Sequence, residues 1–203
     1  MTGAGRAIRE TGAIGIAGSH SGSRTPTSMR MSCHLPHQIP LFLAAMAVAG
    51  AATPEQKLAE LNVVLPTPSA PVANYVPAVR VGSLVFLAGH IPRTTAGQPV
   101  TGKVGRDVTV AEAAAAARNA ATYLLASLKR EIGDLSKVRR IVKVVGLVNC
   151  TDEFQQQSVV MNGCSDLLVS VFGERGRHAR AALGTNALPV GAVVEIDMIV
   201  EVE

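Results

Sequence analysis

The sequence predicts an α+β domain in which two helices cover one face of a mixed β-sheet. The last ten residues, Val194 to Glu203, place five apolar side chains on one face, which is typical of a half-buried strand. Residues 109–132 and 154–172 instead repeat apolar side chains at helical spacing, and strand-like runs precede, separate and follow them. One layer of helices covers only one face of a sheet, so we expect an oligomer whose sheets pack together.

The composition allows one domain of ordinary size and an appendage. Of the 203 residues 48% are hydrophobic but only 3% are aromatic, so the core must be aliphatic. The net charge of +4 lies mostly in residues 1–52, which carry +3, and the remaining +1 leaves no basic excess for nucleic-acid binding. Three scattered cysteines show no metal-binding spacing and suit a reducing compartment.

Residues 1–52 are interpreted as a disordered or targeting extension that precedes a domain over residues 53–203. The apolar run from Ile39 to Ala52 is too short to span a bilayer, and it resembles the apolar region of a secretory signal. The Arg- and Ser-containing leader also fits a mitochondrial transit peptide, and a non-functional extension is a third reading. We expect a cytoplasmic protein, or a mitochondrial matrix protein if the leader is a transit peptide, with secretion less favoured and no membrane partner.

The first half of the domain begins with a predicted short helix from Thr53 to Leu61. Thr53 can cap this helix, and Pro54 suits its first position. After a proline-rich connector, Arg80 to Gly89 is predicted to form a strand. Residues Ile91 to Val104 contain turn signals and are predicted to include a return strand.

Two helices and a strand follow. Thr109 and Glu112 form a capping-box pattern for a helix that runs to Ile132, and its alanines let it lie close to a sheet. The β-branched run Val138 to Asn149 predicts a strand, and Phe154 to Phe172 predicts the second helix. The apolar residues expected to point inward on that second helix are Val160, Cys164, Leu167, Leu168 and Val171.

The chain is predicted to end in a hairpin. The run Ala179 to Ala187, the turn residues Leu188 to Gly191 and the final strand would bring Arg180 opposite Glu195. Such a pair has two readings. It is either a structural salt bridge or an anion clamp beside a base that activates water.

Two runs resemble a known family. GSLVFLAGHIP, residues 82–92, and ARAALGTNALPVGAVVE, residues 179–195, resemble the RidA (YjgF) family of reactive-intermediate deaminases, which is also labelled endoribonuclease L-PSP. The resemblance covers Thr53 to Glu203 and implies a chorismate-mutase-like fold. The run NGCSDLLVSVFGERGRHAR is similar to the family branch that carries the endoribonuclease label.

The resemblance implies a homotrimer with clefts between subunits, each of which binds a small carboxylate. Arg180 matches the carboxylate-binding arginine of the family, and Glu195 matches the glutamate that positions water. Gly89 matches the glycine whose backbone faces the ligand, Tyr75 an aromatic residue near the N-terminus, and Asn162 the helical asparagine. No metal or organic cofactor is implied.

This chain departs from the family pattern at several positions. Ala88 and Ala182 replace a frequent serine and cysteine, and His90 stands where the family often has glutamine. His178, two residues before Arg180, replaces a proline of the family pattern and could touch a ligand, although a surface or interface histidine is the plainer reading.

Three functions remain open on the sequence. A deaminase would hydrolyse 2-imino or enamine acids to 2-oxo acids and ammonia, with Arg180 as the carboxylate fork and Glu195 as the proton acceptor. A non-catalytic regulatory trimer would bind small carboxylates. A ribonuclease is disfavoured because the nearly neutral body and the scarcity of aromatic residues give RNA little to hold.

Overall fold

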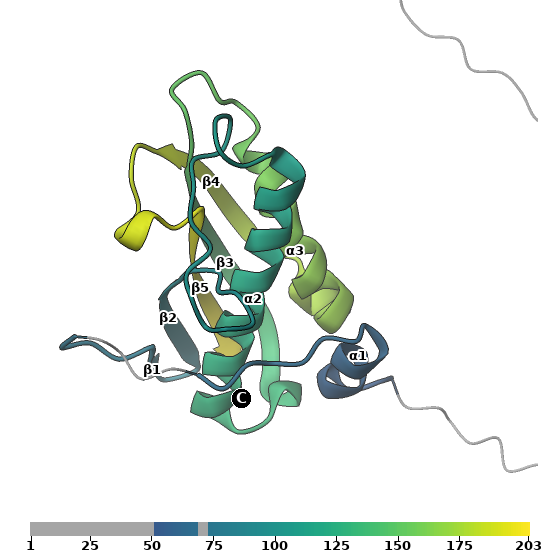
Figure 1. Ribbon diagram of the computed structural model, residues 1–203. Coiled ribbons are helices and arrows are strands. Elements are labelled where there is room, and N and C mark those ends of the chain that lie inside the picture. The colour runs from purple at the N-terminus through teal and green to yellow at the C-terminus, as the bar shows by residue number, and fades with distance from the viewer. Residues whose placement is uncertain (1–50, 69–72) are drawn as a thin grey trace, which may run out of the picture. The chain divides into compact units, whose positions relative to one another are not determined.

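The computed structural model describes residues 51–68 and 73–203, which form a five-stranded sheet with helices on one face (Figure 1). The strands lie in the order β1-β2-β5-β3-β4, and β3 and β4 are the parallel pair in an otherwise antiparallel sheet. The predicted α+β class is therefore confirmed. The predicted extension lies outside the described residues except for its last two positions. No helix in the described part of the chain is long and apolar enough to cross a bilayer.

The N-terminal elements confirm one prediction and correct two. Helix α1, Pro54–Glu60, is capped by Thr53 as predicted, and the structure adds a capping box between Thr53 and Gln56. The predicted single strand is instead a tight hairpin of β1, Ala78–Val81, and β2, Leu84–His90. Gly82 makes the turn with a φ of +60°, a conformation that glycine adopts without steric cost. The predicted return strand over 91–104 is also wrong, because this segment makes only isolated bridges, such as the one between Arg93 and Pro99.

The two long helices form where the sequence predicts them. Helix α2, Val110–Ile132, starts at the Thr109 capping box, and α3, Gln157–Phe172, starts three residues later than predicted. Gly163 lets them touch, because a Cβ atom there would overlap the carbonyl oxygen of Ala114 on α2. The small residues of α2 thus serve close packing against α3 as well as against the sheet. All five residues predicted to point inward on α3 are buried.

The C-terminal strands exist as predicted, but their pairing differs. Strand β4, Ala179–Thr185, pairs in parallel with β3, Val138–Asn149, and β5, Val194–Val202, pairs antiparallel with the other side of β3. The predicted terminal hairpin is therefore wrong. The crossover through α3 places β4 beside β3 as a parallel βαβ unit, so the loop at 186–193 must carry the chain past β3 before β5 begins.

The faces of the sheet differ sharply. On β5 the five residues of the predicted apolar face are buried under the helices, and the residues between them are only partly buried. The helix-free face also carries large apolar side chains that remain exposed, among them Val79, Phe86 and Leu183, at 49%, 41% and 52%. Apolar surface of this kind is typical of a protein–protein contact.

Candidate functional site

Glu195 lies in a cavity that is lined by β2, β5, helix α2 and neighbouring loops. It lines a space of about 420 Å³ together with Gly89 and Tyr75, two of the other residues predicted for the site. Its carboxylate packs directly against the backbone of Gly89, where a Cβ atom would overlap Oε1. Partial burial, and secondarily the negative charge of Asp197, raise the pKa of Glu195 above its usual 4.5. A carboxylate of this kind is better suited to accept a proton near neutral pH than an exposed one.

Arg180 lies on β4, and α3 holds its guanidinium in place. Nη1 donates to Asn162 Oδ1 at 2.9 Å and to Ser165 Oγ at 3.0 Å, and Nη2 donates to the Ser158 carbonyl at 3.3 Å. Ser165 Oγ also lies 3.1 Å from Nε2 of His178, whose Nδ1 donates to a backbone carbonyl. The guanidinium is thus oriented but remains exposed to solvent. Asn162, predicted as a substrate-binding residue, contacts it directly.

The structure does not bring Arg180 and Glu195 together within one chain. Strand β3 separates them, and no ion pair between them occurs in the described residues, so the reading of a cross-strand salt bridge within the chain is wrong. Arg180 reaches α3 on the helix-bearing face of the sheet. Glu195 lies between the fully buried Val194 and Ile196, so its side chain points to the opposite face. The predicted site residues therefore form two separate groups.

A histidine–serine pair lies in the same cavity as Glu195. His90 Nδ1 is 2.7 Å from the Ala88 carbonyl, and Nε2 is 2.7 Å from Ser127 Oγ on α2. Burial lowers the pKa of His90, so the ring is neutral at pH 7. A carbonyl only accepts, so Nδ1 carries the proton and Nε2 accepts from the Ser127 hydroxyl. The sequence analysis missed Ser127, although a single serine within the buried stripe of α2 was an available signal.

A larger cavity shares Pro68 with the Glu195 cavity but includes neither Glu195 nor Arg180 in its lining. It measures about 620 Å³ and lies between α1, the connector that follows α1, and α2. Its lining is mostly aliphatic, and none of the predicted site residues belongs to it. Within the described ranges, no group of three or more His, Cys, Asp and Glu residues is placed to hold a metal ion. The candidate site residues therefore lie in the smaller cavity and around Arg180.

Residues 55–202 match the family model described as "YjgF/chorismate mutase-like, putative endoribonuclease". The chain belongs to this family. Protein TCP17 of Trypanosoma cruzi is 42% identical over 157 residues, which cover 77% of this chain and 98% of that protein. The family assignment that the sequence analysis reached from two short runs is confirmed.

Two solved structures resemble this family member closely. The Agrobacterium tumefaciens protein Atu1372, described as having unknown function, is 47% identical with a TM-score of 0.69, covering 74% of this chain and 92% of that one. A "putative endoribonuclease" from Shewanella oneidensis MR-1 is 32% identical with a TM-score of 0.72, covering 74% of this chain and all of that one. These likenesses support the YjgF/chorismate mutase-like fold that the sequence predicts.

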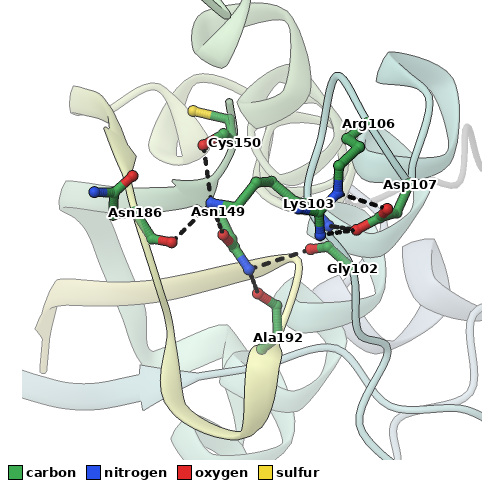
Figure 2. Close-up of polar contacts among 8 residues, drawn as sticks. All are labelled: Gly102, Lys103, Arg106, Asp107, Asn149, Cys150, Asn186 and Ala192. Carbon is green, nitrogen blue, oxygen red and sulfur yellow. Dashed lines mark hydrogen bonds and ion pairs between the residues drawn. The ribbon is translucent and has the colours of Figure 1, made fainter. Parts of the chain in front are cut away.

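A lysine ammonium organises the loops at the end of the sheet in this family member (Figure 2). Lys103 Nζ donates to Asn149 Oδ1 at 2.9 Å, to the Cys150 carbonyl at 3.1 Å and to the Asn186 carbonyl at 2.7 Å. Its own backbone N–H donates to Asp107. Three oxygens from two separate segments thus converge on one tethered cation, which holds these segments together.

The same cluster fixes the loop between β4 and β5. The buried Asn149 amide donates to the carbonyls of Gly102 and Ala192, at 3.3 Å and 3.2 Å (Figure 2). This loop contributes Pro189 to the wall of the cavity and then leads into the strand that carries Glu195. Lys103 and Asn149 therefore position one wall of the cavity from outside it.

Proposed function

We propose that this protein is a cofactor-independent hydrolase that deaminates 2-imino acids, or their enamine tautomers, to 2-oxo acids and ammonia. The observation that carries the proposal is the carboxylate of Glu195, which is partly desolvated and pressed against the bare backbone of Gly89 inside a cavity. A proton acceptor beside an open backbone position is what a water-activating site requires.

The reaction needs few parts. A protonated imine is already electrophilic at the carbon next to the carboxylate. Water attacks that carbon while Glu195 takes a proton from the water, which gives a carbinolamine. Glu195 then returns this proton to the amino nitrogen, the carbon–nitrogen bond breaks, and ammonia leaves while the remaining hydroxyl gives its proton to Glu195 and becomes the carbonyl. A placed general base of this kind contributes on the order of 10²–10⁴ in rate. The guanidinium of Arg180 would hold the substrate carboxylate as a two-pronged fork.

Because Arg180 and Glu195 lie on opposite faces of one sheet, we propose that each site forms between two copies of the chain in a homotrimer. One copy would supply Arg180 and Asn162, and its neighbour would supply Glu195, Gly89 and Tyr75. The apolar side chains exposed on the helix-free face support such an assembly, because association would remove them from water.

The test is an assay of imine hydrolysis on the full chain, with imines generated in place by an amino-acid oxidase. Arg180→Ala should lower kcat/KM by about 10²–10⁴-fold, because two charge-assisted hydrogen bonds to the substrate are lost. Arg177→Ala is the matched control, since Arg177 is an exposed arginine close by in the chain that pairs with Glu174. Unchanged turnover in an Arg180→Ala protein that still assembles contradicts the proposal.

Two other functions give different results in the same experiment. A non-catalytic carboxylate-binding trimer would bind 2-oxo acids saturably and accelerate no imine. The Shewanella oneidensis relative is described as a "putative endoribonuclease". Ribonuclease activity here would appear as RNA cleavage that survives in a preparation from which imine hydrolysis is absent.

A further inference from the structure

The walls of the Glu195 cavity are rich in flat side chains. The chain has two tyrosines, Tyr75 and Tyr123, and both line this cavity. Pro77, Pro99 and Pro189 supply further flat apolar surface. In a chain with only 3% aromatic residues, this gathering marks the cavity as a place where a planar ring can pack against other rings.

The cavity is also larger than a short imino acid requires. Its volume of about 420 Å³ lies in the range of pockets that hold drug-sized ligands. An imine derived from alanine, which carries only a methyl side chain, would leave most of this space to water. A substrate with a long side chain would fill the space and would bury apolar area against the tyrosines and prolines.

The buried end of the cavity presents a hydrogen-bond acceptor, the Oγ atom of Ser127. Ser127 is only 4% exposed, and its hydroxyl proton is used by Nε2 of the neutral His90 ring. The serine oxygen therefore offers lone pairs to the cavity and no proton. Arg93 and Arg130 lie close enough to help lower the pKa of His90, so a neutral donor suits this end better than a cationic one.

We propose that this cavity selects 2-imino acids whose side chain is a neutral planar ring with a hydrogen-bond donor at its far end, the phenol ring derived from tyrosine being the simplest case. The ring lies against Tyr75 and Tyr123, and its donor reaches Ser127 Oγ. His90 acts here as a positioning residue, because it fixes the direction of the serine proton. This selection rests on the deaminase function proposed above and names its substrate class.

The first test compares substrates on the wild-type protein. Imines are generated from tyrosine, O-methyltyrosine, phenylalanine and alanine, and kcat/KM is measured for each. The tyrosine imine should exceed the phenylalanine and O-methyltyrosine imines by about tenfold, the effect of one hydrogen bond, and the alanine imine should be slowest. Equal values for tyrosine and O-methyltyrosine, or a preference for alanine, would overturn the inference while leaving the deaminase function intact.

The second test does not depend on catalysis. Calorimetry measures the binding of 4-hydroxyphenylpyruvate, phenylpyruvate and pyruvate, the 2-oxo acids that correspond to three of the imines. Tighter binding of the phenol compound, by about tenfold, supports the selection even if no imine is hydrolysed. If the protein neither hydrolyses imines nor prefers the phenol compound, both proposals fail.

Variants then assign the selection to Ser127. Ser127→Ala should bring the ratio of tyrosine to phenylalanine kcat/KM close to one. Ser170→Ala is the matched control, because Ser170 lies exposed on α3 and bonds only within its own helix. His90→Gln tests the positioning role without emptying the site, and it should weaken the ratio less than Ser127→Ala does. If a folded Ser127→Ala protein kept the wild-type ratio of tyrosine to phenylalanine kcat/KM, the assignment to Ser127 would be overturned.

Discussion

The Glu195 region and the Arg180 region share a histidine–serine hydrogen-bond arrangement, but its role differs between them. In each region, a histidine donates from Nδ1 to the carbonyl two residues earlier, and its Nε2 is hydrogen-bonded to the Oγ atom of a serine on a helix that covers the sheet. At His90 the serine closes the buried end of a cavity that holds a partly desolvated carboxylate. At His178 the serine supports a guanidinium that stays in solvent.

Under the proposed function, this difference means that one chain carries two incomplete halves of a site. The carboxylate half lies within a cavity whose lining includes Gly89 and Tyr75, and Glu195 packs against Gly89. The guanidinium half is only a preoriented group on an edge strand, and β3 separates it from the other half. An exposed fork becomes effective when it is brought into a drier environment, because electrostatic attraction strengthens as water is removed. The arrangement therefore favours completion by a second copy.

The largest expected effect comes from separating the halves onto different chains. Arg180→Ala and Glu195→Gln proteins should each be nearly inactive, but a co-assembled equal mixture should recover about one quarter of wild-type activity, since about half of the subunits supply each intact half. The measurement is imine hydrolysis by the mixed, purified assembly. A mixture no more active than its parents would show that the halves do not meet between copies.

A second prediction tests the enclosed half alone. Gly89→Ala should lower kcat/KM by about 100-fold, because the new Cβ atom displaces the carboxylate of Glu195, and misplacement by about 1 Å can cost that much. Gly82→Asn, in the turn of the same hairpin, is the control, because asparagine tolerates positive φ and no atom lies within 4 Å of a Cβ there. Near wild-type kinetics for Gly89→Ala would contradict the assigned place of Glu195.

The third prediction concerns the loop that joins the two halves. Lys103→Met removes the cation on which three oxygens converge, and it should destabilise the protein by about 1–3 kcal/mol and lower kcat/KM by about tenfold. Urea unfolding and the imine assay measure both effects. Lys57→Met, on the exposed surface of α1, should leave both values near wild type. Loss of stability with unchanged kinetics would show that the cluster does not position the cavity.

The smallest effect is a dependence of stability on pH. Folding raises the pKa of Glu195 above its usual 4.5, so the folded protein holds this proton more tightly than the unfolded chain does. At low pH the carboxyl is protonated in both states and does not reduce the free energy of unfolding. As the pH rises above 4.5 the folded protein must carry a partly desolvated charge, and its stability falls. Glu195→Gln should therefore have a higher Tm than wild type at pH 7, and the difference should shrink toward pH 4. The control is the exposed Glu153→Gln. A lower Tm for Glu195→Gln at pH 7 would contradict the desolvation of this carboxylate.

Much of the fold was predictable because it depends on local patterns. Capping boxes at Thr53 and Thr109 set helix starts, and the buried faces of α3 and β5 follow directly from apolar spacing. The errors lie where local pattern gives no information about partners. Residues 80–89 look like one strand until Gly82 turns the chain, and the runs at 179 and 194 look like a hairpin although each pairs with β3.

The sequence by itself determined most of the elements and the family, and it supplied the candidate site residues other than Ser127, because periodicity, capping and the runs around Arg180 and Glu195 depend only on the order of the amino acids. Only the tertiary structure decided which residues meet. Whether two strands pair is a matter of crossover geometry, and whether a serine such as Ser127 faces a histidine 37 residues away depends on how a helix lies on a sheet. The division of the site into two faces follows from that packing.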